Sequence, residues 1–367
     1  MIIKRFVQAS VVCALLCSWF ALGRAQEQPL AEAEAEHAGA AASTHSECKI
    51  CRWVEIETAK ISARYLFVDD SEGHIEAKQS QHQELFEGRF KFDPAGRLAL
   101  HAGVFTGNNF AGGWNDTGLG KRTRGSANLY LKQLYLSAEP IHGVEIDYGG
   151  LGILNGESSG ITGYAGDGYL VGERLVVRRP ENLFFDQIAV TYAYLGDYFT
   201  PNLNKRYHRL KQSNYHQFLI GKKIGNRAAV SGEYTFQEGR ETLRQAIRIK
   251  TPELRFLDTV RFENYQRTDV QAAYGFALAG EKKLFHRLTL GGGITQVDRN
   301  FGPFNDDAFF DGRRFFVSSE LEVSPEFSFS LLYNRAVANN YDVGNRTHFH
   351  IAVHYDLLRS LKRTGIF

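Results

Sequence analysis

Charged side chains recur at every second position in several segments of this sequence. Glu87, Arg89 and Lys91 occupy one parity of residues 85–92, whereas Phe86 and Phe90 occupy the other. Successive side chains of a β-strand point to opposite faces, so the segment predicts a strand with one charged and one apolar face. A row of charges needs water or opposite charges beside it, so we expect these faces to be hydrated.

The same parity argument selects a larger set of charged residues and histidines. Facing charges of opposite sign across a water-filled space create a transverse field that orients ions and polar solutes. The alternative is that each member is only a solvated wall residue. The set that parity places on the hydrated side is Glu87, Arg89, Lys91, Arg97, Arg244, Arg248, Lys250, Arg261, Glu263, Arg314, Glu320, Glu322, His348, His350 and His354.

Three of these histidines share one strand face and raise the question of a metal site. Residues two apart along a strand are separated by ~6.6 Å, which is too far for an easy chelate. We therefore predict that His348, His350 and His354 bind no metal, and the sequence points to no cofactor.

Hydrolytic chemistry would need a serine or acidic residue beside a histidine. No spacing marks a nucleophile, so no catalytic residue is predicted, although a hydrolase built on a barrel stays open as an alternative. The serines and histidines considered for that role are Ser318, Ser319, His208 and His216.

Sixteen alternating segments must position these side chains. Tyr and Phe are abundant at 17 and 27 residues, there are 36 Gly, and Pro is scarce at 8, which is typical of a β-rich chain. Many segments are near the ~9–11 residues of a tilted membrane-spanning strand. The predicted strands are 53–67, 84–92, 97–106, 128–138, 144–154, 170–179, 186–196, 214–223, 227–238, 242–250, 255–267, 269–282, 287–299, 313–323, 327–338 and 347–358.

Connections of two kinds join these segments. Short turns such as residues 93–96 follow even-numbered strands, whereas long Gly/Asn/Asp-rich connections follow several odd-numbered ones, including the first, third, fifth and seventh. This parity places the short turns at one end and the long loops at the other. Either of two long loops, 107–127 or 155–167, could fold inward and constrict a lumen, or be an external loop. Their candidate charges are Asp116, Lys121, Arg122, Arg124, Glu157 and Asp167.

The N-terminus has the layout of a secretory signal peptide. Lys4 and Arg5 precede an apolar run, and small residues surround a cleavage region near Arg24, so we assign residues 1–25 to the signal. Its removal takes away three positive charges and changes the formal net charge from +2 to −1. A near-neutral chain lacks the basic footprint that nucleic-acid binding requires.

Residues 26–52 form an Ala/Glu-rich tether that ends in a Cys-x-x-Cys pair. In an oxidising compartment, a disulfide between Cys48 and Cys51 is the leading interpretation. Arg52 stands where covalent haem attachment requires histidine. Metal binding with His37 and His45 is the alternative.

Alternation alone would also suit a soluble β-sandwich. The export signal, the loop parity and the run of consecutive hairpins favour a membrane barrel instead. In these features residues 53–367 resemble the porin class of Gram-negative outer-membrane proteins, as architecture rather than as a motif.

The resemblance implies an all-β fold, a transmembrane antiparallel up-and-down β-barrel of about 16 strands with short periplasmic turns and long extracellular loops. It further implies location in the cell outer membrane and passive diffusion of small hydrophilic solutes or ions without enzymatic activity. The implied partners are outer-membrane lipid and the barrel assembly machinery, and a homotrimer is one arrangement open to the chain. A non-conducting surface-binding or scaffold barrel is the third alternative. The terminal Phe367 matches such barrels, but residues 358–367 depart from a strand pattern.

Overall fold

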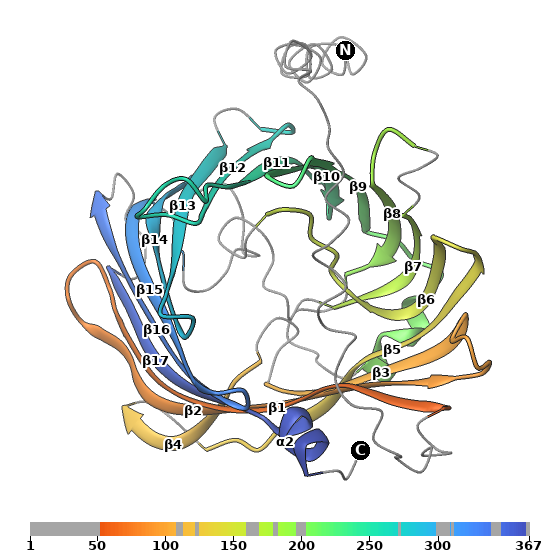
Figure 1. Cartoon of the computed structure of the whole chain (residues 1–367), viewed down its shortest axis with the longest axis horizontal. Coiled ribbons are helices and arrows are strands. Elements are labelled where there is room, and N and C mark those ends of the chain that lie inside the picture. Colours follow the sequence, from red (N-terminus) through yellow and green to blue (C-terminus); the bar gives the residue numbers. More distant parts are fainter. Residues whose placement is uncertain are drawn as a thin grey trace. The chain divides into compact units, whose positions relative to one another are not determined.

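Antiparallel strands follow one another around a closed ring (Figure 1). The structure is a computed structural model that describes residues 52–107, 113–121, 125–158, 169–178, 183–195, 203–270, 273–298, 309, 312–338 and 346–364. The predicted signal peptide, the tether up to residue 51 and the cysteines Cys48 and Cys51 lie outside the described residues.

The bounds of the strands are β1 (Val54–Asp69), β2 (Ile75–Lys91), β3 (Leu98–Thr106), β4 (Asn115–Lys121), β5 (Leu129–Ile141), β6 (Val144–Gly152), β7 (Tyr169–Val177), β8 (Gln187–Tyr194), β9 (Tyr215–Ile224), β10 (Ala228–Gln237), β11 (Arg240–Lys250), β12 (Thr259–Arg267), β13 (Tyr274–Leu284), β14 (Leu288–Val297), β15 (Gly312–Ser324), β16 (Phe327–Ala338) and β17 (Thr347–Asp356). Apart from β4, the strands pair in chain order, with β3 pairing with β5.

Helical structure is confined to three short pieces in the described part of the chain. The 3-10 helices η1 (Leu203–Lys205) and η2 (Tyr207–Arg209) lie between β8 and β9, and helix α2 (Leu357–Arg363) follows β17. The carboxylate of Asp356 accepts a hydrogen bond from the Arg359 amide at 2.9 Å and caps α2. The described residues contain no helix that is long and apolar enough to cross a membrane.

The first and last strands close the ring. β1 pairs with β2 on one side and with β17 on the other, from Lys60 opposite Asp356 to Asp69 opposite Thr347. Within the described residues the sheet has 17 strands, and β4 lies in register beside the part of β2 that precedes its pairing with β3. The closed barrel therefore has 16 strands, as the sequence predicts.

Each of the 16 predicted segments overlaps one barrel strand, and the main difference lies in β2. The long connection predicted between the first two strands is wrong, because β2 already begins at Ile75. The intervening turn is tight, since the Asp70 carboxylate accepts hydrogen bonds from the Glu72 and His74 amides at 2.9 and 2.7 Å. Residues 75–83 have no apolar face, so their sequence gives no strand signal.

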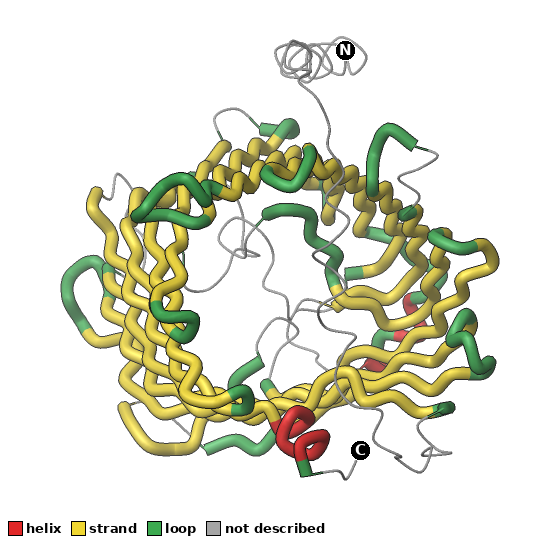
Figure 2. The backbone as a smooth tube through the Cα atoms, in the orientation of Figure 1, coloured by secondary structure: helices red, strands yellow, loops and turns green. Residues whose placement is uncertain are grey.

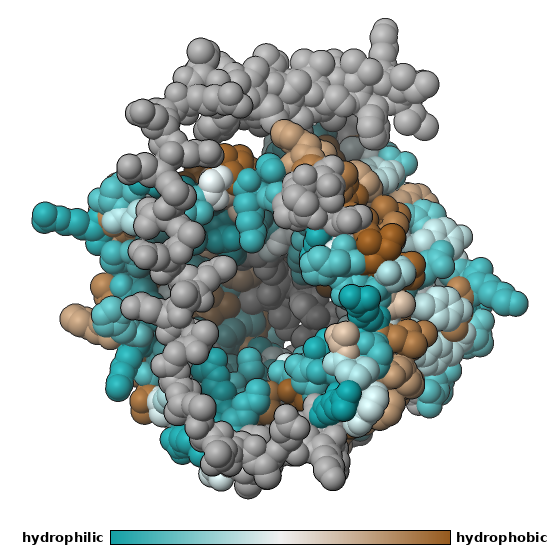
Figure 3. Space-filling view, turned by 45° about the vertical axis from the view of Figure 1, so that its right-hand side comes forward, coloured by the Kyte–Doolittle hydropathy of each residue, from teal (hydrophilic) through white to brown (hydrophobic). Residues whose placement is uncertain are grey.

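Apolar side chains form a belt on the outer face of the barrel. Ile247, Phe262, Leu278, Ile294 and Phe315 are successive cross-strand partners from β11 to β15. Phe262 and Ile294 are both 44% exposed, although they lie in the middle of their strands. Figure 3 shows hydrophobic residues gathered over part of this outer surface. The outer face therefore presents large apolar side chains to its surroundings.

Two aspartates brace the end of the barrel that carries the short turns. Asp186 accepts hydrogen bonds from the Lys223 amide and the Lys222 ammonium at 2.5 and 3.1 Å. Asp258 accepts the equivalent pair from Lys283 and Lys282 at 2.8 and 2.6 Å.

These hydrogen bonds lower the pKa of both turn carboxyls. The backbone bond from Lys223 is the largest cause at Asp186, and the side-chain bond from Lys282 is the largest at Asp258. The two turns thus have the same arrangement of one aspartate and two consecutive lysines, which we call the Asp–Lys–Lys brace.

Close strand contacts predict which glycines tolerate a side chain. A Cβ on Gly172 of β7 would collide with the Tyr192 carbonyl oxygen and lie 2.5 Å from the Ala193 Cα, whereas on Gly221 of β9 its nearest neighbour, the Gln187 Cβ, would be 3.7 Å away. We expect Gly172→Ala to lower the free energy of unfolding by about 1–3 kcal/mol through overpacking. The matched variant Gly221→Ala should change it by less than about 0.5 kcal/mol. Urea midpoints of the folded barrel measure both, and equal midpoints would contradict the register of β7 and β8.

Candidate functional site

The inner face of the barrel carries the polar and charged side chains. Figure 3 shows a hollow bordered by hydrophilic residues. Parity along each strand separates this face from the apolar belt: in β11, Arg244, Ala246 and Arg248 share one face, and Ile247 and Ile249 share the other. The inner face is therefore the candidate functional site.

One inner cluster is centred on Glu233 of β10. Its carboxylate oxygen Oε1 accepts hydrogen bonds from Arg244 Nη1 at 3.0 Å, Gln217 Nε2 at 3.1 Å and Thr235 Oγ1 at 2.9 Å. Glu233 and Arg244 are only 2% and 4% exposed. A buried ion pair requires such additional hydrogen bonds, so these residues from β9, β10 and β11 hold each other in place. The predicted set contains Arg244 but not Glu233, although the alternation of Glu233 with Tyr234 was a signal for it.

The connection after β6 enters the barrel. Glu157 forms an ion pair with Arg248 of β11, with 2.7 Å between Oε2 and Nε, and its amide donates to Ser231 Oγ of β10 at 2.8 Å. Gln217 Nε2 of β9 donates to the Leu154 carbonyl at 2.6 Å. Residues 153–158 thus lie across the inner faces of β9, β10 and β11, several strands from β6, as the inward trace in Figures 1 and 2 shows.

The other candidate loop takes a different course where the structure describes it. Residues 115–121 form β4, which extends the sheet beside β2, and Asp116 accepts a hydrogen bond from Gln81 at 2.9 Å. These contacts are with the strand ring and not with the opposite inner wall. Arg122, Arg124, Asp167 and the side chain of Lys121 lie outside the described residues.

A second inner cluster lies near the short-turn end. Glu55 Oε2 is 2.7 Å from Arg89 Nη2 and 2.6 Å from Lys91 Nζ, and Glu57 lies 3.5 Å from His101. Sequence parity selects Arg89 and Lys91 but misses both glutamates. Their alternation with Val54 and Ile56 was the available signal, and it is obscured by a β-bulge between Ile56 and Thr58.

The histidines of β17 take part in two separate contacts. The ring nitrogens of His348 and His350 approach to 3.2 Å, which is closer than the repeat of an ideal strand implies. His354 instead lies 2.9 Å from Ser62 Oγ and 2.8 Å from Ser330 Oγ, on the strands that flank β17. The described residues contain no group of three or more potential metal ligands.

The remaining predicted residues are spread around the ring. Arg314 is fully buried and donates to Asn334 Oδ1 at 2.9 Å, and Glu263 is 1% exposed. The structure brings Arg248 to Glu157 and Arg89 to Lys91 through Glu55, but it does not gather the other members into one site. Those in exposed or half-exposed positions are Glu87, Arg97, Lys250, Arg261, Glu320 and Glu322.

The residues considered for hydrolysis lie far apart in the ring. His216 of β9 stacks between Tyr192 and Phe236, with centroid distances of 4.8 and 5.5 Å. Ser318 and Ser319 lie on β15, and His208 belongs to η2. These positions form no serine–histidine pair.

The inward course of residues 153–158 predicts a specific cross-link. A Cβ built on Gly156 lies 2.5 Å from the Ser231 Cβ, so Gly156→Cys combined with Ser231→Cys brings two thiols within reach of a disulfide after a small shift. We expect a reductant-sensitive change in gel mobility of the folded barrel. The control pairs Gly156→Cys with Ser330→Cys on β16, which should not cross-link. Equal cross-linking in both would contradict the position of this loop.

Comparison with known proteins identifies the fold. No family model and no curated protein sequence matches the chain. Among solved structures, a multiply substituted porin of Rh. blastica superimposes with a TM-score of 0.53 at 11% identity, covering 82% of this chain and 100% of that one. OmpF of Salmonella typhi superimposes with a TM-score of 0.52 at 12% identity, covering 82% and 97%. The chain therefore has the closed 16-strand barrel fold of the porins.

Proposed function

We propose that this chain is an outer-membrane, porin-like channel through which small hydrophilic solutes or ions diffuse passively. The observation that carries the proposal is the Glu157–Arg248 ion pair, which holds a loop segment against the inner wall of the barrel. A loop inside a barrel narrows the path and places fixed charges beside it, which is how a channel discriminates among solutes.

The distribution of polarity supports a bilayer setting. In a membrane, strand backbones must be paired around a closed ring, and lipid-facing side chains must be apolar. The belt through Phe262, Leu278 and Ile294 meets the second requirement, and the pairing of β1 with β17 meets the first. The signal peptide assigned to residues 1–25 would export the chain, and the assembly machinery and a homotrimeric partner remain parts of this proposal.

Opposed charges on the inner wall support the transport of polar solutes. Arg89 and Lys91 face Glu55 near the short-turn end, whereas Arg248 faces Glu157 where the loop enters. Such pairs create local electric fields along the route that a solute takes through the barrel, and they line this route with polar groups. A passive channel needs no catalytic group, so we propose no enzymatic activity.

The charge pairs predict the effect of substitutions on ion selectivity. Purified protein in a planar bilayer should give stepwise, ohmic conductance, and Arg248→Gln should shift the reversal potential towards cation preference because Glu157 is left uncompensated. Arg313→Gln is the matched control, since Arg313 is exposed on the opposite face of β15 from Arg314. It should leave selectivity unchanged. A folded barrel that shows no conductance steps would overturn the proposal.

The apolar belt predicts a membrane-specific cost. Phe262→Arg places a charge amid Ile247 and Leu278 near the middle of β12, and should lower stability in a lipid bilayer by about 2–4 kcal/mol. Refolding midpoints in lipid vesicles measure this cost. Glu263→Gln, on the inner face, tests whether the effect depends on the face. A smaller cost for Phe262→Arg than for Glu263→Gln would mean that the faces are assigned the wrong way round.

A further inference from the structure

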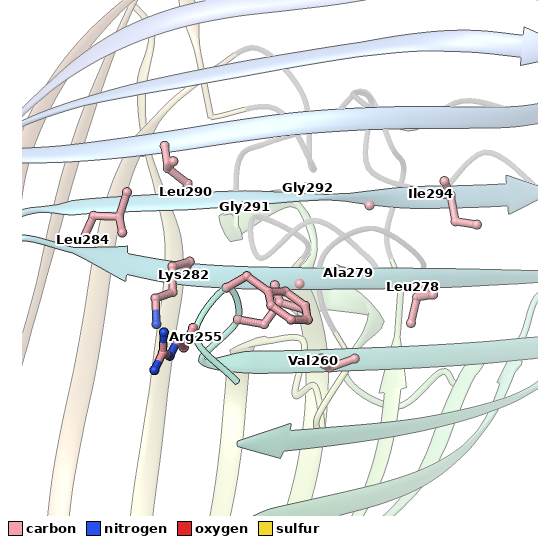
Figure 4. A pocket seen from close by; sticks show the side chains of 14 residues that line it. Arg255, Val260, Leu278, Ala279, Lys282, Leu284, Leu290, Gly291, Gly292 and Ile294 are labelled. Carbon is pink, nitrogen blue, oxygen red and sulfur yellow. The ribbon is translucent and has the colours of Figure 1, made fainter. Parts of the chain in front are cut away.

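An apolar groove interrupts the outer belt across β12, β13 and β14. Its floor is formed by Gly280 of β13 and Gly292 of β14, which are direct cross-strand partners on the outer parity. Leu278 and Ile294 line one side of the groove. Val260 of β12, the cross-strand partner of Gly280, also lines it. The groove encloses about 710 Å³ (Figure 4). Leu257, from the turn before β12, covers Gly280, where an added Cβ would lie 2.8 Å from the leucine Cδ2. At Gly292 no side chain comes within 4 Å of such a Cβ, so the depression lies over Gly292, beside Leu257.

The end of the groove nearest the short turns is cationic. Arg255 and Lys282 line it, and Figure 4 shows their nitrogen atoms together at that end. Lys282 Nζ also contacts Asp258 at 2.6 Å, whereas Arg255 is exposed and makes no ion pair with any described residue. Phe256, 69% exposed, lies between Arg255 and Leu257 in the same turn. One end of an apolar groove therefore carries an excess positive charge.

A second Asp–Lys–Lys brace lacks both features and provides an internal comparison. Around Asp186 and Lys222, the floor position equivalent to Gly280 is Ile220, which pairs with Gly232. A Cβ on Gly232 would lie 3.5 Å from Ile220, so the isoleucine fills the space. Leu183 stands in the position of Arg255. The brace itself therefore requires neither the groove nor the additional arginine.

We propose that this groove binds a phospholipid with a net negative headgroup, with an acyl chain over Gly292, beside Leu257, and the phosphate beside Arg255 and Lys282. An acyl chain gains from a depression lined by apolar side chains. A phosphate gains charge-assisted hydrogen bonds from arginine and lysine. The short-turn end of a membrane barrel lies at the headgroup level, so one lipid molecule reaches both features.

The inference rests on the membrane setting of the proposed function but not on conductance. Native mass spectrometry of the detergent-solubilised protein, titrated with phosphatidylglycerol or phosphatidylcholine, measures lipid retention. We expect preferential retention of phosphatidylglycerol. Gly292→Leu, which fills the groove, and Arg255→Gln, which removes the exposed cation, should each weaken retention about tenfold. Soluble glycerol phosphate should not compete, because it has no acyl chain.

Matched variants in the second brace region are the controls. Gly232→Leu and Lys223→Gln, whose exposed side chain follows Lys222 in that brace, should leave phosphatidylglycerol retention unchanged. Equal retention of both lipids, with no effect of Gly292→Leu, would overturn the inference and indicate ordinary annular lipid. A change in the number of associated chains without a change in lipid retention would also overturn it, because the groove would then be a contact between copies.

Conductance separates the two proposals. Gly292→Leu and Arg255→Gln lie on the outer side and should retain wild-type conductance while losing the lipid. A conducting barrel without selective lipid retention contradicts only the lipid site. A barrel that retains phosphatidylglycerol selectively and conducts no ions contradicts only the channel.

Discussion

Closure of the strand ring is the constraint on which the rest of the structure depends. A barrel in lipid has no water to hydrogen-bond a free strand edge, so β1 must match β2 and β17 at the same time. A slip of one residue in either register would exchange the two faces of a strand. The bulge between Ile56 and Thr58 resolves a conflict of this kind, because it lets Glu55 and Arg64 both face inward although their spacing is odd.

Closure of the ring determines which face of each strand points into the barrel. The buried charged side chains on the inner faces then require partners of opposite charge or hydrogen-bonding groups on neighbouring strands. Glu233 meets this requirement through Arg244, Gln217 and Thr235, so a single carboxylate links three strands. Arg248 lies four residues beyond Arg244 on the same face of β11 by strand parity, and it is paired with Glu157 from the loop after β6. The Arg248 and Glu157 side chains are 31% and 23% exposed, so this pair compensates charge on a partly hydrated wall, in contrast to the buried pair at Glu233.

Much of the fold could be predicted from the sequence because its period is local. Phe86 and Phe90 against Arg89 and Lys91 identify a strand from eight residues, and the same reasoning locates all 16 barrel strands. It fails for residues 75–83, whose polar run becomes strand only through pairing with β1 and β4. It also fails to choose between the two candidate loops. The partner of Glu157 is 91 positions away, and no local pattern connects a loop residue to a distant strand.

The residues of the two Asp–Lys–Lys braces can be recognised in the sequence, but the contact between them cannot. Asp186 and Asp258 each end a turn that contains a phenylalanine, and the strand after the next turn or loop ends in consecutive lysines, so both elements are visible in the sequence. Their contact depends on the register between two consecutive strands, which brings together residues 36 positions apart in the first brace and 24 in the second. The brace then holds the same backbone geometry with Ile220 or with Gly280 on the adjacent outer position. At Gly280 an added Cβ would lie 2.8 Å from Leu257 Cδ2, so the glycine makes room for a leucine from the turn. The two sites therefore differ in which residue covers the outer position, the strand's own isoleucine in one and a turn leucine in the other, although their strand and turn backbones are braced in the same way.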